Sequence, residues 1–587
     1  MATFTSVQSG DFDDPTTWDI GASYPQSLDD FVIVATHTVT VPNGLTVTTQ
    51  GTVGGTSSAN RGVLSIADGG KLTLNGNLVL TDWNELRIAG GGELDINGNN
   101  VTVDNSTAEV NYINIVGTAG NRAKVSSSTA GSGNFQRDTG GGMPGIFLID
   151  YCDFVDCGNI QIGNNFFSPN DFSVKHTVFV GCNTTTLGGF QHGDNDYILE
   201  NIDFRDDRAT TNIAIIQRSD GGAASGTGTQ SITNITAVAN TASILRWELD
   251  GVDRSNIVTD RVLHSSVIAR GGIAKDSFFR MRTTAGGAID NGGIDEVRDC
   301  YIFSDCDNPH TNSGALDIIT RGVIEATYTQ GYTDDGDHFI VSPTRSQDCI
   351  ETVIIEAKSG VLMNALGSAT SGTYNTTKCT LYGDYDAVYG SLCRTESGGS
   401  WGGTINLQSN LIVAQTTGAR GFNIDTAGND QITLMDYNAW FNVTDQYFGV
   451  TSATKTAGVT AGYGGNDING EDPAFVDNTR NLAKWAGTVT ATATADSGVS
   501  HLLKINGYNE TSKTQVSGDI ISETPRDLTD YVRAGFSPTN TAYQGTAHDG
   551  GDIGAVAVTE IVAGSAFGGI INGIKTGIKA GIYKGIK

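Results

Sequence analysis

The feature that most constrains this chain is a triple spacing of short apolar pairs between residues 63 and 103. In each pair one residue separates the two apolar residues, as in Leu72-Thr73-Leu74, which is typical of a short strand with one buried face. Matching pairs recur after 22 or 23 residues, in Leu64 and Leu86, Leu72 and Leu94, and Leu78 and Val101. Hairpins would pair consecutive strands, so this spacing predicts a parallel coil with three strands in each turn.

Segments rich in glycine and asparagine separate the apolar pairs of this stretch, at residues 68–70, 75–77, 90–92 and 97–100. Glycine and asparagine tolerate positive φ and therefore favour sharp turns. We expect the strand to break at each of these segments.

The repeat lengthens from about residue 146 onwards. Phe154, Phe179 and Phe204 stand in similar phrases and lie 25 residues apart, and related phrases continue with insertions to about residue 413. This spacing predicts one turn of the coil for each phrase, with the inward side chains of each turn stacked on those of the turn before. The insertions predict long loops between the strands, and such loops commonly carry function.

The composition suits such a coil and disfavours one class of partner. A chain of 587 residues is long for a single ordinary core, and it carries 77 glycines but no long helical pattern. Its net charge of −29 disfavours binding to nucleic acid, because phosphate contacts need lysine and arginine. No nucleic-acid partner is therefore expected.

The eight cysteines lack the spacing of metal-binding motifs, and several stand inside strand-like segments. We predict that they are buried thiols that stack along the coil. These residues are Cys152, Cys157, Cys182, Cys300, Cys306, Cys349, Cys379 and Cys393.

We expect four regions along the chain. They are an N-terminal cap with the first strands (residues 1–62), the coil with its loop insertions (63–460), the last turns with a closing β region (461–560) and a cationic tail (561–587). The start of the sequence lacks the basic and apolar segments of a signal peptide, and no apolar run reaches about 18 residues. Neither export through a signal peptide nor a transmembrane span is expected.

Phrases near both ends of the chain resemble a known family. Asp14-Pro15-Thr16-Thr17-Trp18 and Asp29-Asp30-Phe31-Val32-Ile33 stand near the start, and Asp472-Pro473-Ala474-Phe475-Val476-Asp477 and Asp552-Ile553-Gly554-Ala555 near the end. They resemble the opening and closing phrases of right-handed parallel β-helix proteins of the pectin-lyase-like superfamily. The resemblance implies an all-β fold, a right-handed single-stranded parallel β-helix with an N-terminal cap and a short C-terminal tail.

The acidic coil, the expected lack of an export signal and the cationic tail are together similar to bacteriophage tail spikes, tail fibres and other virion surface proteins. That similarity implies a structural protein of the virion, made in the host cytoplasm, that contacts polysaccharide on the host-cell surface. Two alternatives stay open: a polysaccharide depolymerase, either a lyase or a glycoside hydrolase, and a purely structural or decoration protein without a ligand.

Hydrolysis of a glycosidic bond needs two carboxyl groups roughly 5 to 10 Å apart, and three acidic clusters could supply them. They are Asp203, Asp206 and Asp207; residues 246–254; and Asp334, Asp335 and Asp337 beside His338. We favour the second cluster, because a tryptophan beside acids can stack on a sugar ring. Its predicted catalytic residues are Glu248, Asp250 and Asp253, and its predicted glycan-binding residues are Trp247, Arg246 and Arg254.

Acidic clusters also arise on solvated loops in a chain with 64 acids, so a role without chemistry stays open for each of them. No metal site is predicted. The segment 334–337 offers oxygen ligands to Ca²⁺ but lacks the complete spacing of a calcium-binding loop, so no cofactor is expected.

The tail repeats Gly-Ile every four residues and carries lysines, which as a helix would form a glycine stripe beside an isoleucine stripe. Its several glycines disfavour an independent helix, so we predict an assembly segment that orders against other virion proteins or copies of itself, with a trimer favoured. Contact with a membrane and a disordered tail are the alternatives. The assembly residues are Gly573, Ile574, Lys575, Gly577, Ile578, Lys579, Gly581 and Ile582.

Overall fold

The computed structural model describes the chain in segments that include most of the predicted strands. These are residues 2–26, 29–34, 36–54, 61–81, 84–103, 112–137, 146–163, 171–191, 196–205, 212–219, 230–238, 244–249, 254–262, 273–281, 296–304, 318–326, 338–340, 347–356, 361–365, 373–383, 391–395, 404–415, 419–424, 432–448, 464–482, 489–490, 502–503 and 525–559.

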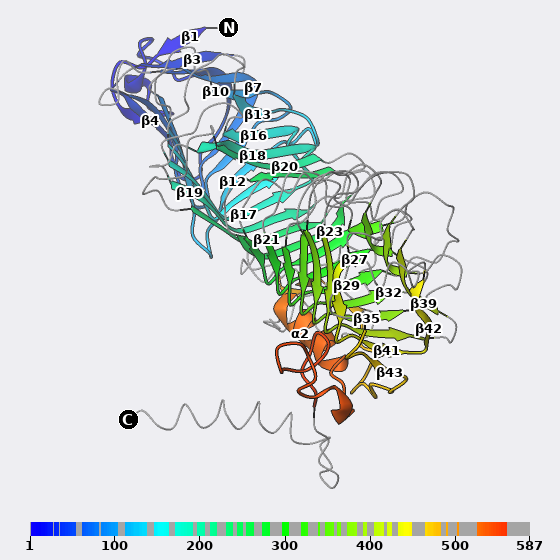
Figure 1. Ribbon diagram of the computed structural model, residues 1–587. Helices are drawn as coiled ribbons and strands as arrows, with labels where there is room; N and C mark the ends of the chain where they lie inside the picture. The colour runs from blue at the N-terminus through cyan, green and yellow to red at the C-terminus, as the bar shows by residue number, and fades with distance from the viewer. Residues whose placement is uncertain are drawn as a thin grey trace, which may run out of the picture.

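The chain winds into an elongated parallel coil, with the first strands at one end and the last at the other (Figure 1). One sheet of 38 strands contains almost all of the described strands, and its strand pairings are parallel. The predicted all-β parallel solenoid is therefore confirmed. The right-handed winding and the N-terminal cap stay predictions.

Three rows of strands run along the coil, and the strands of each row pair with those of the turns before and after. Row 1 contains β2 (Gly10–Asp11), β4 (Thr38–Val41), β6 (Gly62–Ile66), β8 (Asn84–Ala89), β11 (Tyr112–Val116), β14 (Phe147–Asp150), β24 (Ile273–Lys275), β26 (Glu296–Arg298), β28 (Ile318–Thr320), β31 (Gln347–Ile350), β34 (Thr373–Thr377), β37 (Thr404–Gln408) and β40 (Ile432–Asp436).

Row 2 contains β9 (Glu93–Asp95), β12 (Ala123–Ser126), β15 (Cys152–Val155), β25 (Phe278–Met281), β27 (Tyr301–Ser304), β29 (Val323–Ala326), β32 (Val353–Glu356), β35 (Thr380–Gly383), β38 (Leu411–Ala414), β41 (Ala439–Phe441) and β43 (Ile468–Asn469). Four long strands belong to both row 1 and row 2, namely β17 (Asp171–Val180), β19 (Asp196–Arg205), β21 (Gln230–Val238) and β23 (Arg254–Val262).

Row 3 contains β1 (Thr3–Thr5), β3 (Asp30–Ile33), β10 (Val101–Val103), β13 (Phe135–Arg137), β16 (Asn159–Gly163), β18 (Thr184–Gln191), β20 (Asn212–Ser219) and β22 (Ile244–Leu249), and it shares β5 (Thr46–Val53) and β7 (Lys71–Leu80) with row 2. A second parallel sheet contains β30 (His338–Ile340), β33 (Val361–Ala365), β36 (Ser391–Thr395), β39 (Ala419–Ile424) and β42 (Val443–Phe448). The remaining elements are η1 (Pro15–Thr17), the antiparallel pair β44 (Val489–Thr490) and β45 (Leu502–Leu503), α2 (Pro525–Gly535) and η5 (Thr541–Tyr543).

The register of the first turns matches the triple spacing residue by residue. Leu64 pairs with Leu86, Leu72 with Leu94, and Leu78 with Val101. One predicted break is wrong, because β7 runs without interruption through residues 75–77. The predicted turn residues instead form a bulge within β7, where residues 75–77 stand opposite the single residue Gln50 of β5, and the pairing resumes beyond it.

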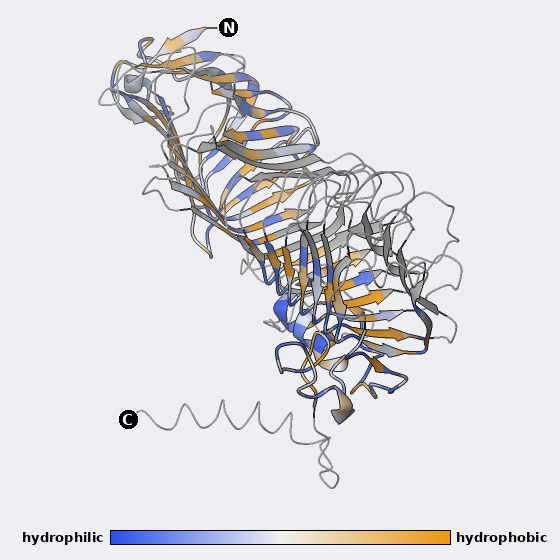
Figure 2. Ribbon diagram, in the orientation of Figure 1, coloured by the Kyte–Doolittle hydropathy of each residue, from blue (hydrophilic) through white to orange (hydrophobic). Residues whose placement is uncertain are grey.

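Hydrophobic and hydrophilic residues alternate along the strands of the coil (Figure 2), and the buried hydrophobic residues form its interior. Phe154 pairs with Phe179, and Phe179 pairs with Phe204, as the 25-residue spacing predicts. The three rings stack with centroids 4.9 and 5.0 Å apart, close to the spacing of neighbouring strands. Each turn therefore completes the core of the turn beside it.

Six of the eight cysteines are described with their side chains, and all six are buried free thiols, as predicted. Cys379 Sγ lies 3.5 Å from Cys349 Sγ on the neighbouring turn. The predictions for Cys306 and Cys393 lie outside the described side chains. Small apolar thiols fit the narrow interior of the coil because adjacent turns approach closely.

A column of residues with left-handed backbone marks the corner between rows 1 and 2. Their φ values lie between 44° and 60°, a conformation that non-glycine residues rarely adopt. This corner column consists of Tyr151, His176, Asn201, Asn234, Asp276, Asp299, Arg321, Glu351, Lys378, Ser409 and Tyr437. In each of these turns of the coil, the residue of this column marks the bend between the row 1 strand and the row 2 strand.

Candidate functional site

The favoured acidic cluster falls on strand β22 and the residues that follow it. Arg246, Trp247 and Glu248 are in β22, and Arg254 begins β23. Their side chains, like the whole of Asp250 and Asp253, lie outside what the structure describes. The assignment of these six residues stays a prediction.

The register of β22 nevertheless distinguishes its residues. Trp247 stands in the column of Ile162 and Leu187, which are fully buried. Arg246 stands in the alternate column, which begins at the half-buried Gln161, and Glu248 is two residues further along the same strand. By alternation, Arg246 and Glu248 share a register face that differs from the face of Trp247.

The other sequence candidates are described only in part. Asp203 lies in β19 with 2% of its surface exposed, whereas Asp206 and Asp207 lie outside the described residues. His338 begins β30, but Asp334, Asp335 and Asp337 also lie outside the described residues, as does the whole tail from residue 561. Among the described residues, no group of three or more potential metal ligands is gathered.

Two outer faces of the coil have opposite character, and the first is covered. From β25 to β41 most outward residues of row 2 are apolar, and residues 525–559, here called the clasp, pack on them (Figure 1). Leu528, Val532 and Phe536 of the clasp join one buried cluster with outward row 2 residues such as Tyr301 and Val353. Further along, Tyr543 and Ile553 pack with Leu411 and Val413.

The sequence carried a signal for this cover that periodicity alone did not bring out. Tyr301-Ile302-Phe303 and Leu411-Ile412-Val413 are apolar at consecutive positions rather than at alternate ones. Ile302 and Ile412 face the interior, whereas their neighbours face the clasp. Consecutive apolar residues in a short strand indicate burial on both faces.

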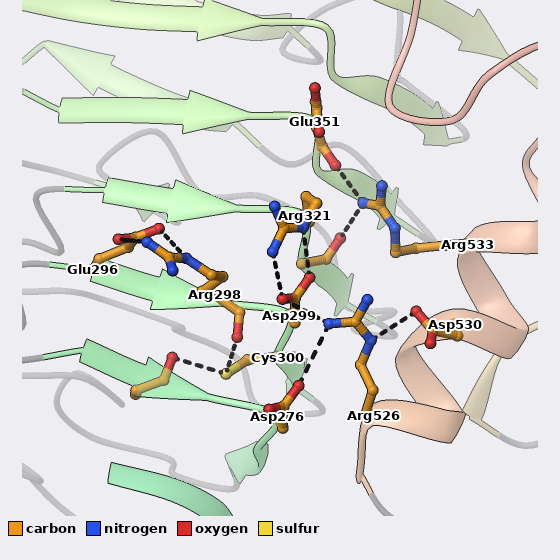
Figure 3. Close-up of polar contacts among 12 residues, drawn as sticks. Asp276, Glu296, Arg298, Asp299, Cys300, Arg321, Glu351, Arg526, Asp530 and Arg533 are labelled. Atoms are coloured by element: carbon orange, nitrogen blue, oxygen red, sulfur yellow. Dashed lines mark hydrogen bonds and ion pairs between the residues drawn. The ribbon is translucent and has the colours of Figure 1, made fainter. Parts of the chain in front are cut away.

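Charged side chains hold the clasp against the corner column (Figure 3). Arg526 Nη1 lies 2.6 Å from Asp299 Oδ2 and 3.4 Å from Asp276 Oδ1, and its Nε lies 2.9 Å from Asp530. Arg321 makes a second, two-pronged contact with Asp299 at 2.7 and 2.8 Å. Burial alone would raise the pKa of Asp299, but the hydrogen bonds and charges of Arg321 and Arg526 lower it.

The same pattern continues along the corner towards the C-terminal end of the coil. Arg533 donates to the backbone oxygens of Glu351 and Ala555, and burial lowers its pKa. Lys378 Nζ lies 2.6 Å from Asp549 Oδ2, and the Ser409 hydroxyl lies 2.9 Å from His548 Nδ1. The corner column is thus the surface to which the clasp is matched.

One acidic side chain beneath this cover is nearly inaccessible. Glu325 is 3% exposed and accepts hydrogen bonds from the Tyr301 hydroxyl and from the backbone N–H of Leu482, the latter at 3.0 Å. Burial raises the pKa of Glu325. A raised pKa suits a general acid, but a group this deeply covered cannot reach a polymer, so its role is structural.

The second outer face, that of row 1, carries exposed or partly exposed side chains among the described residues from β11 to β28. Between β11 and β28 one column of it consists of Val116, Asp150, Lys175, Glu200, Thr233, Ser255, Lys275, Arg298 and Thr320, and beyond them the same register leads to Asp436, which is 7% exposed. From β11 to β28 Val116 is exposed and the other side chains are partly exposed, in contrast to the clasped face. We call this surface the open face.

The polar groups of the open face form local networks along the coil. Lys175 Nζ lies 3.6 Å from Glu200, and Arg298 pairs with Glu296 through two contacts of 2.5 and 2.8 Å. In the next column, Asn406 donates to Asn375, which in turn donates to Asp348, at 2.7 and 2.5 Å. Amides, carboxylates and guanidinium groups thus recur at a spacing of about 4.8 Å, that of neighbouring strands.

No protein-family model, no curated protein and no solved structure matches this chain. No helix among the described residues is long and apolar enough to cross a bilayer.

Proposed function

We propose that this chain is a rod-like surface protein, of the kind carried by virions, whose open face contacts an extended polysaccharide. The observation that carries the proposal is the run of exposed and partly exposed side chains on the open face among the described residues from β11 to β28, whereas the outer face of row 2 from β25 to β41 is buried beneath the clasp. A long row of planar polar groups suits a polymer with many hydroxyl groups, because each turn offers a further set of hydrogen bonds.

The test is binding of purified full-length protein to a panel of bacterial capsular polysaccharides and lipopolysaccharides, by surface plasmon resonance. Arg298→Ala, on the open face, should weaken binding about tenfold, because a charge-assisted contact is lost. The matched control is Lys124→Ala, which removes a half-exposed cation from the outer face of row 2. Equal effects of both substitutions, or no binding by the native protein to any member of the panel, would refute the proposal.

A depolymerase is the second candidate, and the register of β22 is the observation in its favour. Arg246 and Glu248 occupy alternate positions on one strand, in the register of the half-buried Gln161. The assay follows reducing ends and unsaturated uronates in the polysaccharides that bind. Cleavage that Glu248→Gln abolishes would support this candidate, whereas binding without cleavage favours attachment alone.

A further inference from the structure

The clasp is a distinct piece of structure with its own fit to the coil. Its buried residues Leu528, Val532 and Phe536 face outward row 2 residues rather than the interior columns. Its contacts reach across a wide span of sequence, since Arg526 binds Asp276 and Asp299. The clasp therefore bridges several turns of the coil without being one of them.

The surface on which the clasp docks matches it both by apolar contacts and by opposite charges. The acids of the corner column meet Arg526, and Lys378 meets Asp549. Between the charged contacts, apolar residues of rows such as Phe278 and Val323 are covered. A surface with alternating apolar and charged matches accepts few partners, because a mismatched charge would be left buried and unpaired.

The connection to the clasp is long. Residues 483–524 join it to the segment that follows the last turn, and with β44 and β45 paired the rest of this connection can still span up to roughly 90 Å. Such a length reaches the same surface on a neighbouring copy as well as on its own coil. Docking within one chain and docking between two chains would then use identical contacts, and concentration would decide between them.

We propose that the clasp is an exchangeable assembly element, which docks on the row 2 face of a second copy of this chain. The expected partner is a second copy of this chain, because the residues of this surface match those of the clasp. The proposal does not depend on polysaccharide binding, and it is independent of the cationic tail.

The test uses two full-length variants, each of which lacks one half of the interface. Val532→Asp places a charge in the apolar face of the clasp, and Val353→Asp places one in the docking surface. Each variant should hold its own clasp more weakly than the native chain does, and both should retain the coil by far-ultraviolet circular dichroism, since both positions lie on its outside. In a mixture, the intact clasp of the Val353→Asp chain can dock on the intact surface of the Val532→Asp chain.

Hydrogen–deuterium exchange with mass spectrometry reads the result directly. The α2 peptides of the two chains differ in mass at position 532, so each is followed separately. We expect exchange in the α2 peptide of the Val353→Asp chain to slow at least about tenfold on mixing. A mixture with the double variant Val353→Asp/Val532→Asp, which offers no intact surface, should give no slowing.

Native mass spectrometry of the unmodified protein gives a second reading. Refolding at high concentration should yield a larger fraction of paired chains than refolding at low concentration, and the pairs should persist after dilution. If the α2 peptide exchanges at the same rate before and after mixing, the proposal fails. It also fails if the native chain refolds without concentration-dependent pairing.

Discussion

Replacing Phe179 tests whether stacked columns of side chains hold the coil together. Phe179 is 2% exposed and lies between Phe154 and Phe204, with centroids 4.9 and 5.0 Å away. Truncation of a buried phenylalanine to alanine costs about 3–5 kcal/mol, and the loss of two ring contacts places Phe179→Ala towards the upper end. Since about 1.4 kcal/mol corresponds to a factor of ten, amide exchange should accelerate by roughly two to four orders of magnitude.

The effect should also be local, because each turn of a solenoid contacts only its neighbours. We expect faster exchange in β15, β17 and β19, and unchanged exchange in distant strands such as β6 and β38. The control is Val180→Ala, which removes a half-buried side chain from the opposite face of the same strand and should cost less than about 1 kcal/mol. Equal acceleration by the two variants, or acceleration spread evenly along the coil, would refute the stacking argument.

Three further predictions concern a buried carboxyl group, an arginine of the clasp and the buried thiols. In urea denaturation, Glu325→Gln should gain stability relative to the native protein as pH rises above about 4.5. The folded pKa of Glu325 is raised, so the native carboxyl ionises more readily in the unfolded chain than in the folded chain, whereas glutamine has no proton to lose. A stability difference between the two proteins that stays constant from pH 4 to 8 would contradict this. Arg526→Ala should weaken clasp docking by about 1–2 kcal/mol, measured as faster amide hydrogen exchange in α2. The loss is modest because Arg526 is 36% exposed and Arg321 still pairs with Asp299, and amide exchange at the native rate would contradict it. The described thiols should resist alkylation at pH 8 until the protein is denatured, since burial raises the pKa of Cys300 to about 12 and also raises the pKa of Cys152. Rapid labelling of the native protein, read by mass spectrometry, would contradict this.

Much of the coil follows from residue spacing, because a strand's side chains alternate and parallel neighbours share one register. The pairings of Leu64 with Leu86 and of Phe154 with Phe179 are examples. The unbroken strand through Gly76 was not predictable in this way. The glycine and asparagine residues mark the place of the bulge, but the pairing resumes beyond it only because β5 continues alongside, which the local sequence does not show.

The clasp was missed for a different reason. The sequence of α2 carries an apolar pair, Leu528 and Val532, one helical turn apart, but its 11 residues are too few to stand out in a long chain of strands. The consecutive apolar residues of β27 and β38 were the stronger signal, since they imply a cover without identifying it. The predicted catalytic set could not be judged from spacing either, because an acid's role depends on its burial and its neighbours.

The corner column has a consequence for how such a chain tolerates change. Its members are separated by 22 to 42 residues, yet each restarts the following strand in the same phase. Insertions in a loop are therefore absorbed before the next corner and do not propagate to later turns. A single residue added between a corner and its strand would instead exchange inside for outside along that strand. Grafted loops of widely different length should be accepted between the corners, provided that the few residues on either side of each corner are left intact.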